Sequence, residues 1–392
     1  MKIVLLIFQW SLFVYLFVQV FYLLFFSIAG RLAKKTNLPV AKTLRRIRIF
    51  IPAYKEDSVI IDTVRSAVAH DYPKSLFEVI VIADSFSAST LQALKRFSAK
   101  IIEVSFDKST KGKALQKAIE ATKKDEVDIV LVLDADNHMA SGFLHKVNNA
   151  FEYGYKVVQG HRTAKHMQTS FARLDACTEE INNHIFRRGH NAVGLPSALI
   201  GSGMAFSWKL FISLLKDIGE TSGEDKEVEF RIVRQRINVL FLDNAYIFDE
   251  KVAKQDVFSK QRSRWLATQF EFFSKYFIEG WMQLFKGNVS FFNKVFQTYL
   301  LPRVMLIALA GFVWLLAALF FTSWFLTASL LLSSLALSLL LALPSKWYNR
   351  HLLSALLQIP GAFISMIKAL LQVGKARKQF IHTPHGEQLA NQ

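Results

Sequence analysis

A chain that begins with a long apolar stretch has to place that stretch away from water. Residues 3–28 are apolar apart from Gln9, Ser11, Gln19 and Ser27. A helix of about 20 apolar residues crosses a bilayer, whereas the apolar part of a cleaved signal peptide is only about 7–15 residues long. We therefore predict that residues 1–30 form a retained transmembrane anchor.

Basic residues lie almost entirely on one side of this anchor. Only Lys2 precedes it, whereas Arg31, Lys34, Arg45 and Arg48 are among those that follow it. Because Lys and Arg concentrate in the cytoplasmic segments next to a membrane span, we expect the N-terminus outside and the next segment in the cytoplasm.

A second apolar region lies near the C-terminus. Residues 300–343 contain two apolar runs with a very short connection, and we predict two transmembrane helices there. Residues 258–299 mix aromatic side chains with Lys and Arg. We expect amphipathic helices at the membrane interface in that segment, with ordinary core helices as the alternative. Together with the anchor, these segments predict a multi-pass protein, and we expect it in a bacterial inner membrane.

The apolar segment after these spans is interrupted. Residues 344–379 include the pair Pro360-Gly361 and the charged Lys368. A further span here would move the basic residues 375–378 outside, against the charge bias. We therefore expect interfacial or re-entrant helices over 344–379, which keep the tail in the cytoplasm.

The net charge of the chain indicates what kind of partner it binds. The 392 residues carry a formal charge of +17 and one cysteine, Cys177. This excess indicates an anionic partner, such as nucleic acid, anionic lipid or a phosphorylated substrate. A single cysteine excludes an internal disulfide, and no Cys/His spacing predicts a zinc site.

Between the two apolar regions, residues 44–257 have the pattern of an α/β domain. The first part alternates strands with helices, which is typical of a parallel, doubly wound sheet. The predicted strands are residues 46–51, 78–83, 101–104 and 129–133, and the predicted helices are residues 59–68, 89–97 and 113–122. Later residues are less regular, with short strands expected at 157–160 and 204–207 and helices at 171–188 and 225–236.

Acidic residues follow the most apolar of these strands. Residues 129–133 are Ile-Val-Leu-Val-Leu, and Asp134 and Asp136 come directly after them. Ligands collect at the carboxyl ends of strands in open α/β sheets, and two such carboxylates can hold a hard divalent cation on a substrate's phosphates. The alternative is a solvated acidic turn. Asp84 ends another predicted strand, where a carboxylate can accept hydrogen bonds from a nucleobase or a ribose.

Two predicted helices begin with charged residues. Lys111-Gly112-Lys113 opens the first, where backbone amides and lysines attract phosphate. Glu224-Asp225 opens the second, and a carboxylate facing the crevice there could serve as a general base. The plainer interpretations are a solvated lysine pair and a helix N-terminus stabilised by acidic residues.

The most specific short motif is Gln261-Arg262-Ser263-Arg264-Trp265. A guanidinium, an amide and an indole on one helical turn can hold a leaving diphosphate and stack on a sugar. A basic, aromatic helix at a membrane surface is the alternative. In the tail, Thr383 and His385 could belong to a loop that folds over a bound anion.

Taken together, these motifs resemble those of the membrane-embedded family-2 glycosyltransferases, which include cellulose, hyaluronan and chitin-oligosaccharide synthases and ceramide glucosyltransferases. The resemblance covers residues 46–265 and the flanking apolar segments. It implies a GT-A-type, doubly wound mixed sheet in the cytoplasm, with N- and C-terminal transmembrane and interfacial helices. Residues 380–392 would then form a gating-like tail.

The resemblance also implies a role for each motif. Donor and UDP binding would fall to Pro52, Ala53, Tyr54, Glu56, Asp84, Lys113, Asp134, Gln261, Arg264, Thr383 and His385. Mn²⁺ or Mg²⁺ would bind Asp136 with Asp134, the acceptor would contact Gly203 and Trp265, and Asp225 beside Glu224 would be the catalytic base. Many relatives have a second Asp four residues after the one that Asp84 matches, where this chain has Ala88.

The function implied is that of an inverting, metal-dependent hexosyl- or N-acetylhexosaminyltransferase, which moves a sugar from a UDP-sugar to a polysaccharide or oligosaccharide at the membrane. An enzyme that adds a single sugar to a membrane lipid shares every motif. A non-catalytic basic membrane protein would explain the charge, but not the four aspartates at predicted crevice-facing positions. Membrane lipid is an expected partner, nucleic acid is not, and a homo-oligomer is compatible with the sequence.

Overall fold

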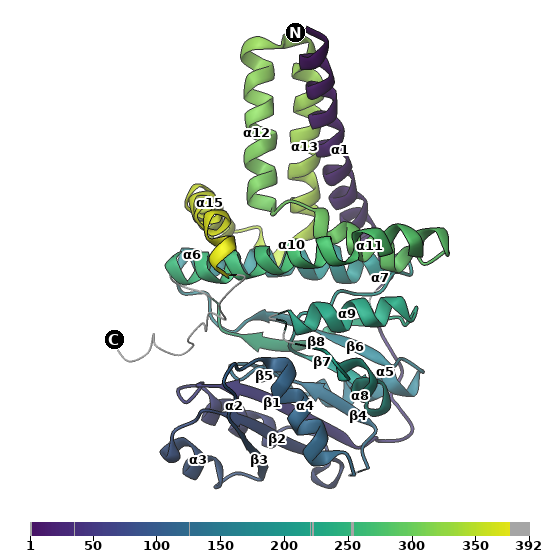
Figure 1. Ribbon diagram of the computed structural model, residues 1–392, viewed down its shortest axis with the longest axis vertical. Coiled ribbons are helices and arrows are strands. Elements are labelled where there is room, and N and C mark those ends of the chain that lie inside the picture. The colour runs from purple at the N-terminus through teal and green to yellow at the C-terminus, as the bar shows by residue number, and fades with distance from the viewer. Residues whose placement is uncertain are drawn as a thin grey trace.

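The computed structural model of the protein describes residues 2–34, 36–124, 126–219, 221, 223–251 and 255–376. Figure 1 shows an α/β domain at the bottom, a layer of helices lying across it, and an upright bundle of helices at the top. The N-terminus lies at the far end of the bundle, so the first helix runs from there down to the layer of helices above the sheet.

The α/β domain is built on an eight-stranded sheet with the order β3-β2-β1-β4-β7-β6-β8-β5. The strands are β1 (Ile47–Tyr54), β2 (Phe77–Asp84), β3 (Ala99–Val104), β4 (Ile129–Val132), β5 (His138–Met139), β6 (Val157–Ala164), β7 (Met204–Ser207) and β8 (Leu240–Asp249). The first four strands are parallel, and β7 is antiparallel to both of its neighbours, β4 and β6. The predicted α/β class with a mixed sheet is therefore confirmed.

Both faces of the sheet are covered by helices, which is why β4 is a continuous apolar run. Leu131 packs into a core with α2 (Ile60–Val68) and α5 (Phe143–Glu152), while Val130 and Val132 pack on the other face against α4 (Lys111–Thr122) and α8 (Trp208–Leu215). Side chains alternate along a strand, so a strand buried on both faces needs an apolar residue at every position. A shorter helix, α3 (Ala88–Leu94), and the turn η1 (Lys74–Leu76) flank β2.

The second half of the sheet contains elements that the sequence pattern did not indicate. Strand β8 and helices α5 and α8 were not predicted. In β8, the polar pair Asp243-Asn244 interrupts the apolar residues, and the pairing with β6 shifts register between Gly160 and His161. A bulge of this kind breaks the strict alternation that marks a strand in a sequence.

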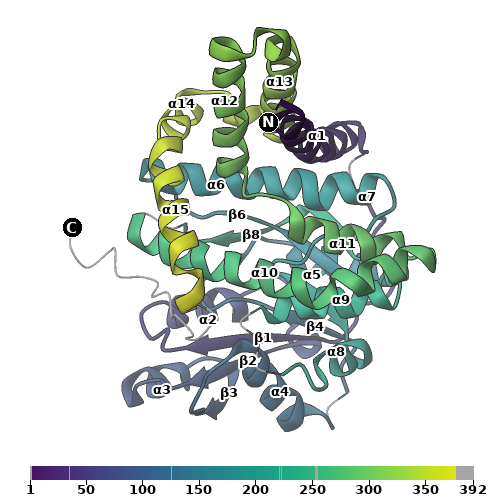
Figure 2. The ribbon, with the colours of Figure 1, turned by 45° about the horizontal axis from the view of Figure 1, so that its top comes forward.

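A layer of helices separates the sheet from the bundle. The helix predicted at 171–188 is α6 (Ser170–Asn182), which continues into a π-helical segment (Asn183–Gly189) and α7 (His190–Ala192). The layer also holds α9 (Glu224–Arg234), α10 (Gln255–Phe285) and α11 (Val289–Tyr299). Figures 1 and 2 show α6 and α10 running beside each other beneath the bundle.

The upright bundle consists of α1 (Lys2–Leu32), α12 (Arg303–Phe320) and α13 (Phe325–Ala342), with the turn η3 (Thr322–Trp324) joining the last two. Within the described residues, four helices are long and apolar enough to cross a membrane: Leu6–Leu32, Arg303–Phe320, Thr322–Ala342 and Leu352–Leu371. The last of these runs through α14 (Arg350–Leu356) and α15 (Ile359–Ala376), after the turn η4 (Ser345–Trp347). Unlike the three bundle helices, α15 lies at the foot of the bundle and crosses over α10 (Figures 1 and 2).

Candidate active site

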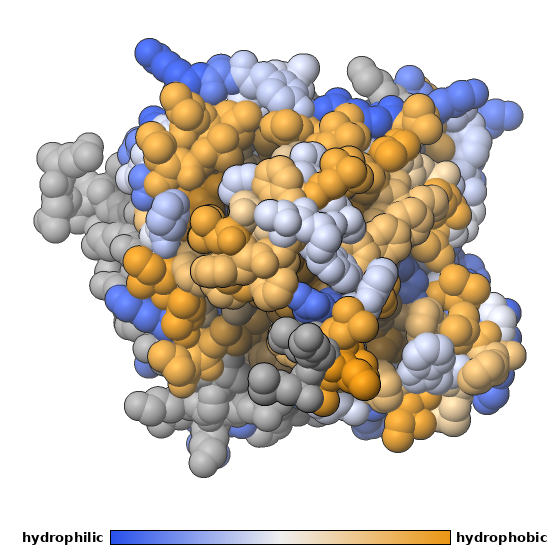
Figure 3. Space-filling model, turned by 90° about the horizontal axis from the view of Figure 1, so that it is seen from above, coloured by the Kyte–Doolittle hydropathy of each residue, from blue (hydrophilic) through white to orange (hydrophobic). Residues whose placement is uncertain are grey.

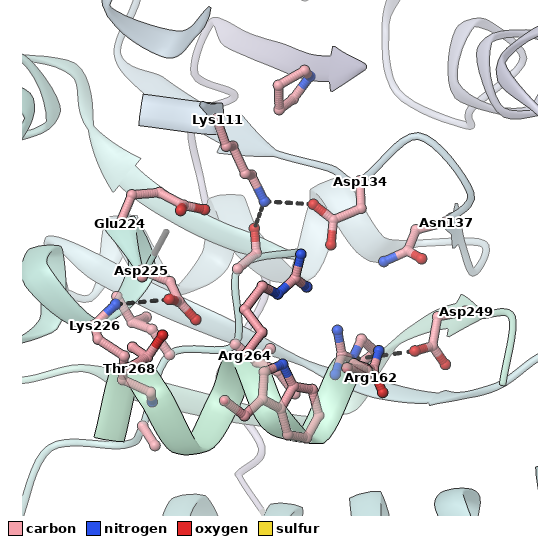
Figure 4. A pocket seen from close by; sticks show the side chains of 18 of the residues that line it. Lys111, Asp134, Asn137, Arg162, Glu224, Asp225, Lys226, Asp249, Arg264 and Thr268 are labelled. Carbon is pink, nitrogen blue, oxygen red and sulfur yellow. Dashed lines mark hydrogen bonds and ion pairs between the residues drawn. The ribbon is translucent and has the colours of Figure 1, made fainter. Parts of the chain in front are cut away.

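A cavity of about 640 Å³ opens where β1, β2 and β4 end, between the sheet and helices α9 and α10. Most of the residues predicted for the site line it. These are Pro52, Ala53, Tyr54, Glu56, Asp84, Asp134, Asp136, Glu224, Asp225, Gln261, Arg264 and Trp265. Residues from distant parts of the sequence therefore meet around one hollow, as Figure 4 shows for several of them.

The ends of β1 and β2 form one rim of the cavity. Tyr54 and Asp84 are register partners, and the backbone N–H of Lys55 donates to the carbonyl oxygen of Asp84 at 3.0 Å. Lys55 (φ 54°) and Ser85 (φ 59°) both adopt the left-handed conformation, which costs a residue with a side chain about 1–2 kcal/mol. The backbone thus turns sharply after both strands. Asp84 as a residue is only 2% exposed, and its Oδ1 accepts from Ser85 Oγ at 2.9 Å.

The loop after β4 is held by a serine that the sequence analysis did not single out. Ser202 Oγ accepts hydrogen bonds from the backbone N–H of Asp134 at 3.0 Å and from Asn137 Nδ2 at 2.6 Å. Ser202 is fully buried. Its hydroxyl therefore sets the position of the loop that carries Asp134 and Asp136. The only sequence feature that could have indicated this role of Ser202 is its position between Gly201 and Gly203.

The two glycines beside Ser202 have different roles. Gly201 lines the cavity, whereas Gly203, predicted to contact the acceptor, is not among the lining residues. Gly203 has φ +64°, and a Cβ at its position would lie 2.1 Å from Ile247 Cδ1. The structure thus gives Gly203 a packing reason to be glycine, since a side chain there would collide with Ile247 of β8.

Lys111, and not Lys113, extends into the cavity. Lys111 Nζ lies 2.5 Å from Asp134 Oδ1 and donates to the carbonyl oxygen of Gly201 at 2.6 Å. Lys113 is absent from the lining, and its Nζ donates to the carbonyl oxygen of Lys108 at 3.2 Å. Burial by itself would lower the pKa of Lys111, but the negative charges of Asp134, Glu224 and Asp225 outweigh it and raise that pKa.

The acidic pair Glu224-Asp225 forms the first turn of α9, after the N-cap Gly223. Carboxylates are stabilised there by the helix dipole, and Asp225 Oδ1 accepts from the backbone N–H of Lys226 at 2.8 Å. Burial raises the pKa of Glu224 to about 7, Lys111 opposes this shift, and Asp225 adds to it. The cavity therefore concentrates negative charge where Lys111 enters.

The Gln261–Trp265 motif lies on α10, on the opposite side of the cavity from the strand ends. In Figure 4, the Arg264 guanidinium extends into the space between Asp225 and Asp134. Arg262 is buried, pairs with Asp175 at 2.7 Å, and lies 4.2 Å from the centre of the Trp265 ring. Trp265 keeps 39% of its surface exposed, so its ring is available at the wall of the cavity.

A network of buried ion pairs, which the sequence analysis missed, forms the remaining wall. Glu179 pairs with Arg162 at 3.0 Å, with Arg187 at 3.3 Å and with Lys251 at 3.9 Å. Arg162 and Lys251 also pair with Asp249, at 3.4 Å and 2.9 Å. In the sequence, this network is indicated only by single charged residues within the apolar patterns of β6 and α6. The residues with which these charges pair are far away in the sequence.

The donor atoms in the cavity suit a hard divalent cation that is shared with a substrate. Asp134 and Asp136 line the cavity beside Asn137, whose Oδ1 is buried and has no hydrogen-bond partner among the described residues. Carboxylate and amide oxygens are ligands that Mg²⁺ and Mn²⁺ prefer. In the described part of the chain, no three His, Cys, Asp or Glu side chains gather around a metal position. The residues present therefore fit an ion whose other ligands are phosphate and water oxygens.

Two predicted site residues cannot be placed. Thr383 and His385, assigned to the gating-like tail 380–392, lie outside the described residues.

The fold and the cavity together define a class of protein. A mixed, curled sheet with acidic residues at its strand ends is typical of glycosyltransferases of the GT-A type. The family model described as "Glycosyltransferase like family 2" matches residues 45–268. The chain belongs to that family.

Curated relatives resemble only part of the chain. "Probable glycosyltransferase YdaM" of Bacillus subtilis is 24% identical over 238 residues, which are 57% of this chain and 55% of the relative. "Poly(ribitol-phosphate) beta-N-acetylglucosaminyltransferase TarS" of Staphylococcus aureus is 27% identical over 97 residues, or 24% of this chain and 17% of the relative. The matches thus leave much of both relatives uncovered.

One solved structure resembles nearly the whole chain. The mannosyltransferase PcManGT from Pyrobaculum calidifontis, determined in complex with GDP-Man and Mn²⁺, aligns with a TM-score of 0.58 at 17% identity. The alignment covers 93% of this chain and 98% of that one. At this identity the likeness concerns the fold, and its extent includes the helices beyond the α/β domain.

Proposed function

We propose that the protein is a membrane-embedded, metal-dependent glycosyltransferase that takes its sugar from a UDP-sugar and inverts the anomeric centre. One observation carries the proposal: Asp84, the Asp134–Asp136 pair, Asp225 and Arg264 line the same cavity. The family supports the glycosyltransferase activity. PcManGT, which was solved with GDP-Man and Mn²⁺, supports a nucleotide-sugar donor and a divalent metal, and the choice of UDP rests on the sequence motifs.

The donor would lie across the ends of β1, β2 and β4. Asp84 would accept hydrogen bonds from the nucleoside, and Asp134 and Asp136 would hold Mn²⁺ or Mg²⁺ beside the diphosphate. A bound divalent cation offsets the negative charge that develops on a leaving diphosphate. Arg264 adds a fixed positive charge on the other side, since a guanidinium binds phosphate oxygens through more than one N–H.

Asp225 would act as the general base. It takes the proton from an acceptor hydroxyl while the hydroxyl oxygen bonds to the anomeric carbon and the bond from that carbon to the diphosphate breaks. A positioned base typically contributes about 10²–10⁴-fold to the rate. Lys111, which lies between Asp134 and the α9 carboxylates, offsets part of the negative charge of this set.

The membrane would surround α1, α12 and α13. Seen from above, the outer surface around the bundle is mostly apolar, and hydrophilic side chains gather at its rim (Figure 3). With the basic residues after α1 on the cytoplasmic side, the α/β domain lies in the cytoplasm. The position of α15 at the foot of the bundle supports an interfacial location for residues 344–379, as an alternative to a fourth span. For the cytoplasmic domain (residues 44–257), the interface helices (258–299) and the tail (380–392), we keep the boundaries that were proposed from the sequence.

Two acceptor classes are compatible with this chemistry: a growing polysaccharide or oligosaccharide, and a membrane lipid. A second cavity at the foot of the bundle favours the lipid.

The test is a donor screen on the purified full chain. We expect one or more UDP-sugars to release UDP in the presence of Mn²⁺ or Mg²⁺, and EDTA to abolish the release. Asp136→Asn should lower nucleotide affinity at fixed Mn²⁺ by at least about tenfold, since it removes a charged ligand, whereas the exposed Asp107→Asn should not. Release from GDP-mannose alone would contradict the UDP assignment, and no binding of either nucleotide would overturn the enzyme proposal.

A further inference from the structure

A second cavity, of about 260 Å³, lies at the foot of the bundle, next to the first. Helices α1, α6, α10, α12 and α15 contribute to its walls. The two cavities share lining residues, which are Asn182, Phe186, Trp265, Gln269 and Gln297. A molecule in the second cavity would therefore reach the first along the Trp265 ring.

Most of the walls of the second cavity are apolar. They include Leu23 from α1, Leu174 from α6, Leu306 from α12 and Met366 from α15. Three of these helices are long and apolar enough to cross a membrane. The cavity is thus suited to an apolar chain at the level where the bundle meets the helical layer.

The polar residues of the second cavity include two arginines and no carboxylate, and Arg303 is the arginine that matters here. The Arg303 guanidinium donates to Asn182 Oδ1 at 2.9 Å and to the carbonyl oxygen of Thr178 at 3.2 Å, both uncharged acceptors. Among the described residues, Arg303 forms no ion pair with a carboxylate, whereas the neighbouring Arg262 pairs with Asp175. A half-buried arginine without a counter-charge is costly unless an anion binds to it.

Two further features favour an anion at the same place. Arg303 is the first residue of α12, where the positive end of the helix dipole already attracts negative charge. Gln19, which is fully buried, lines the cavity and accepts from the backbone N–H of Leu301 through Oε1 at 2.8 Å. Its Nε2 makes no hydrogen bond of normal geometry in the described part of the chain, although the Tyr15 side chain is close enough to interact with it. It can therefore donate to a bound group.

We propose that the second cavity binds the acceptor, and that this acceptor is a lipid with a phosphate group and at least one hydroxyl. The apolar chain lies between α1, α12 and α15, the phosphate pairs with Arg303, and the hydroxyl reaches past Trp265 to Asp225. This inference rests on the proposed glycosyltransferase activity. The lipid oxygen forms the new bond to the anomeric carbon, its proton goes to Asp225, and the electron pair of the broken bond leaves with UDP.

A neutral glycan would not need this arrangement. A neutral polysaccharide has no apolar segment to fill walls of Leu and Met, and no charge to pair with Arg303, and a charged polysaccharide still lacks the apolar segment. Apolar walls together with an arginine that lacks a carboxylate partner match an amphiphile with an anionic head.

The experiment measures lipid binding to the full chain in neutral detergent by native mass spectrometry. The probes are a phosphatidic acid, the diacylglycerol with the same chains, and inorganic phosphate. We expect phosphatidic acid to bind at least about tenfold more tightly than diacylglycerol, because a hydrogen bond to a charged group contributes that much. Inorganic phosphate is expected to bind weakly. Equal binding of the two lipids, or equally tight binding of inorganic phosphate, would overturn the lipid-phosphate assignment.

Variants locate the site. Arg303→Gln should remove the preference for phosphatidic acid, and Val304→Phe should reduce binding of both lipids by filling the cavity, whereas the exposed Arg350→Gln should change neither. Unchanged binding in both cavity variants would place the lipid elsewhere and overturn the inference.

Titration with UDP and Mn²⁺ distinguishes a failure of the acceptor assignment from a failure of the proposed function. Wild type and both cavity variants should bind nucleotide equally, which also shows that the variants are folded. If nucleotide binds and the lipid preference is absent, only the acceptor assignment fails. If wild type binds no nucleotide, the proposed function fails.

Discussion

Two walls of the main cavity contain the same kinds of charged side chain, but these are held in different ways. On the wall formed by strand ends and α9, burial raises the pKa of Glu224 to about 7, and Asp225 adds to the shift. On the wall formed by the ion-pair network, burial alone would raise the pKa of Glu179, but Arg162, Lys251 and Arg187 lower it. Burial acts in the same direction on both carboxyls, and the neighbouring charges decide the outcome.

This difference between the two walls indicates that one serves function and the other serves stability. Carboxylates that crowd together destabilise one another until a cation or a ligand joins them. Carboxylates that are matched by buried cations stabilise the fold, but have little left to offer a ligand. We therefore expect changes on the α9 wall to affect turnover and changes in the ion-pair network to affect unfolding.

The largest expected effect is that of Asp225→Asn. Because the amide cannot take up a proton, turnover should fall by about 10²–10⁴-fold, while the affinity for UDP and Mn²⁺ and the melting temperature stay close to wild type. Product formation, nucleotide titration and thermal unfolding measure the three quantities, with Asp107→Asn as the exposed control. Wild-type turnover in Asp225→Asn would exclude it as the base.

Glu179→Ala should have the opposite pattern. Removing the carboxylate leaves Arg162, Arg187 and Lys251 with uncompensated buried charge, which typically costs about 3–5 kcal/mol. We expect a clear drop in the free energy of unfolding, measured in neutral detergent. Glu103→Gln, at an exposed position on β3, is the control. If Glu179→Ala unfolds like wild type but loses activity, the two walls do not differ as described.

Ser202→Ala tests how the loop after β4 is held. The change leaves the Asp134 N–H and Asn137 Nδ2 without their acceptor, so we expect a destabilisation of about 1–3 kcal/mol. Affinity for UDP with Mn²⁺ should fall as well, because Asp134 and Asp136 lose their fixed position. A variant with normal stability and normal nucleotide affinity would show that the hydroxyl does not position this loop.

The smallest expected effect concerns Glu224 and pH. Its pKa is raised from 4.5 to about 7 in the folded protein, so the folded state binds this proton more tightly than the unfolded state. The contribution of Glu224 is therefore most favourable below its ordinary pKa and is lost as pH rises toward 7.

The matching variant is Glu224→Gln, which does not titrate. Without nucleotide or metal, it should gain stability relative to wild type between pH 5 and pH 8, by about 1 kcal/mol after allowance for partial exposure. Thermal unfolding at the two pH values measures this. An identical pH dependence in wild type and variant would contradict the raised pKa.

Local patterns predicted the parts of the molecule that depend on neighbours in the sequence. The apolar run of β4 indicated a strand covered on both faces, and the aspartates directly after it were expected at its carboxyl end, where the cavity opens. Residues 157–160 and 204–207 were recognised as strands, yet β8 was not, because its bulge opposite Gly160 and His161 breaks the alternation.

Which of two nearby residues enters the site, and which charges pair with each other, could be decided only from the three-dimensional structure. Lys111 and Lys113 are two residues apart on α4, and residues at that spacing point in different directions from a helix. Only Lys111 faces Asp134. The partners of Glu179 come from β6, the π-helical segment and the segment after β8, and no short motif records such pairings.

The sequence by itself determined the α/β domain, the apolar helices at both ends and the acidic residues at the strand ends, because periodicity and strand-end chemistry are properties of short stretches. Only the tertiary structure decided which lysine enters the cavity, how the buried charges are paired, and that Arg303 pairs with Asn182 beside a cavity that Trp265 also lines. Those outcomes depend on packing between helices far apart in the chain, where burial and the nearest charge set the energy of each group.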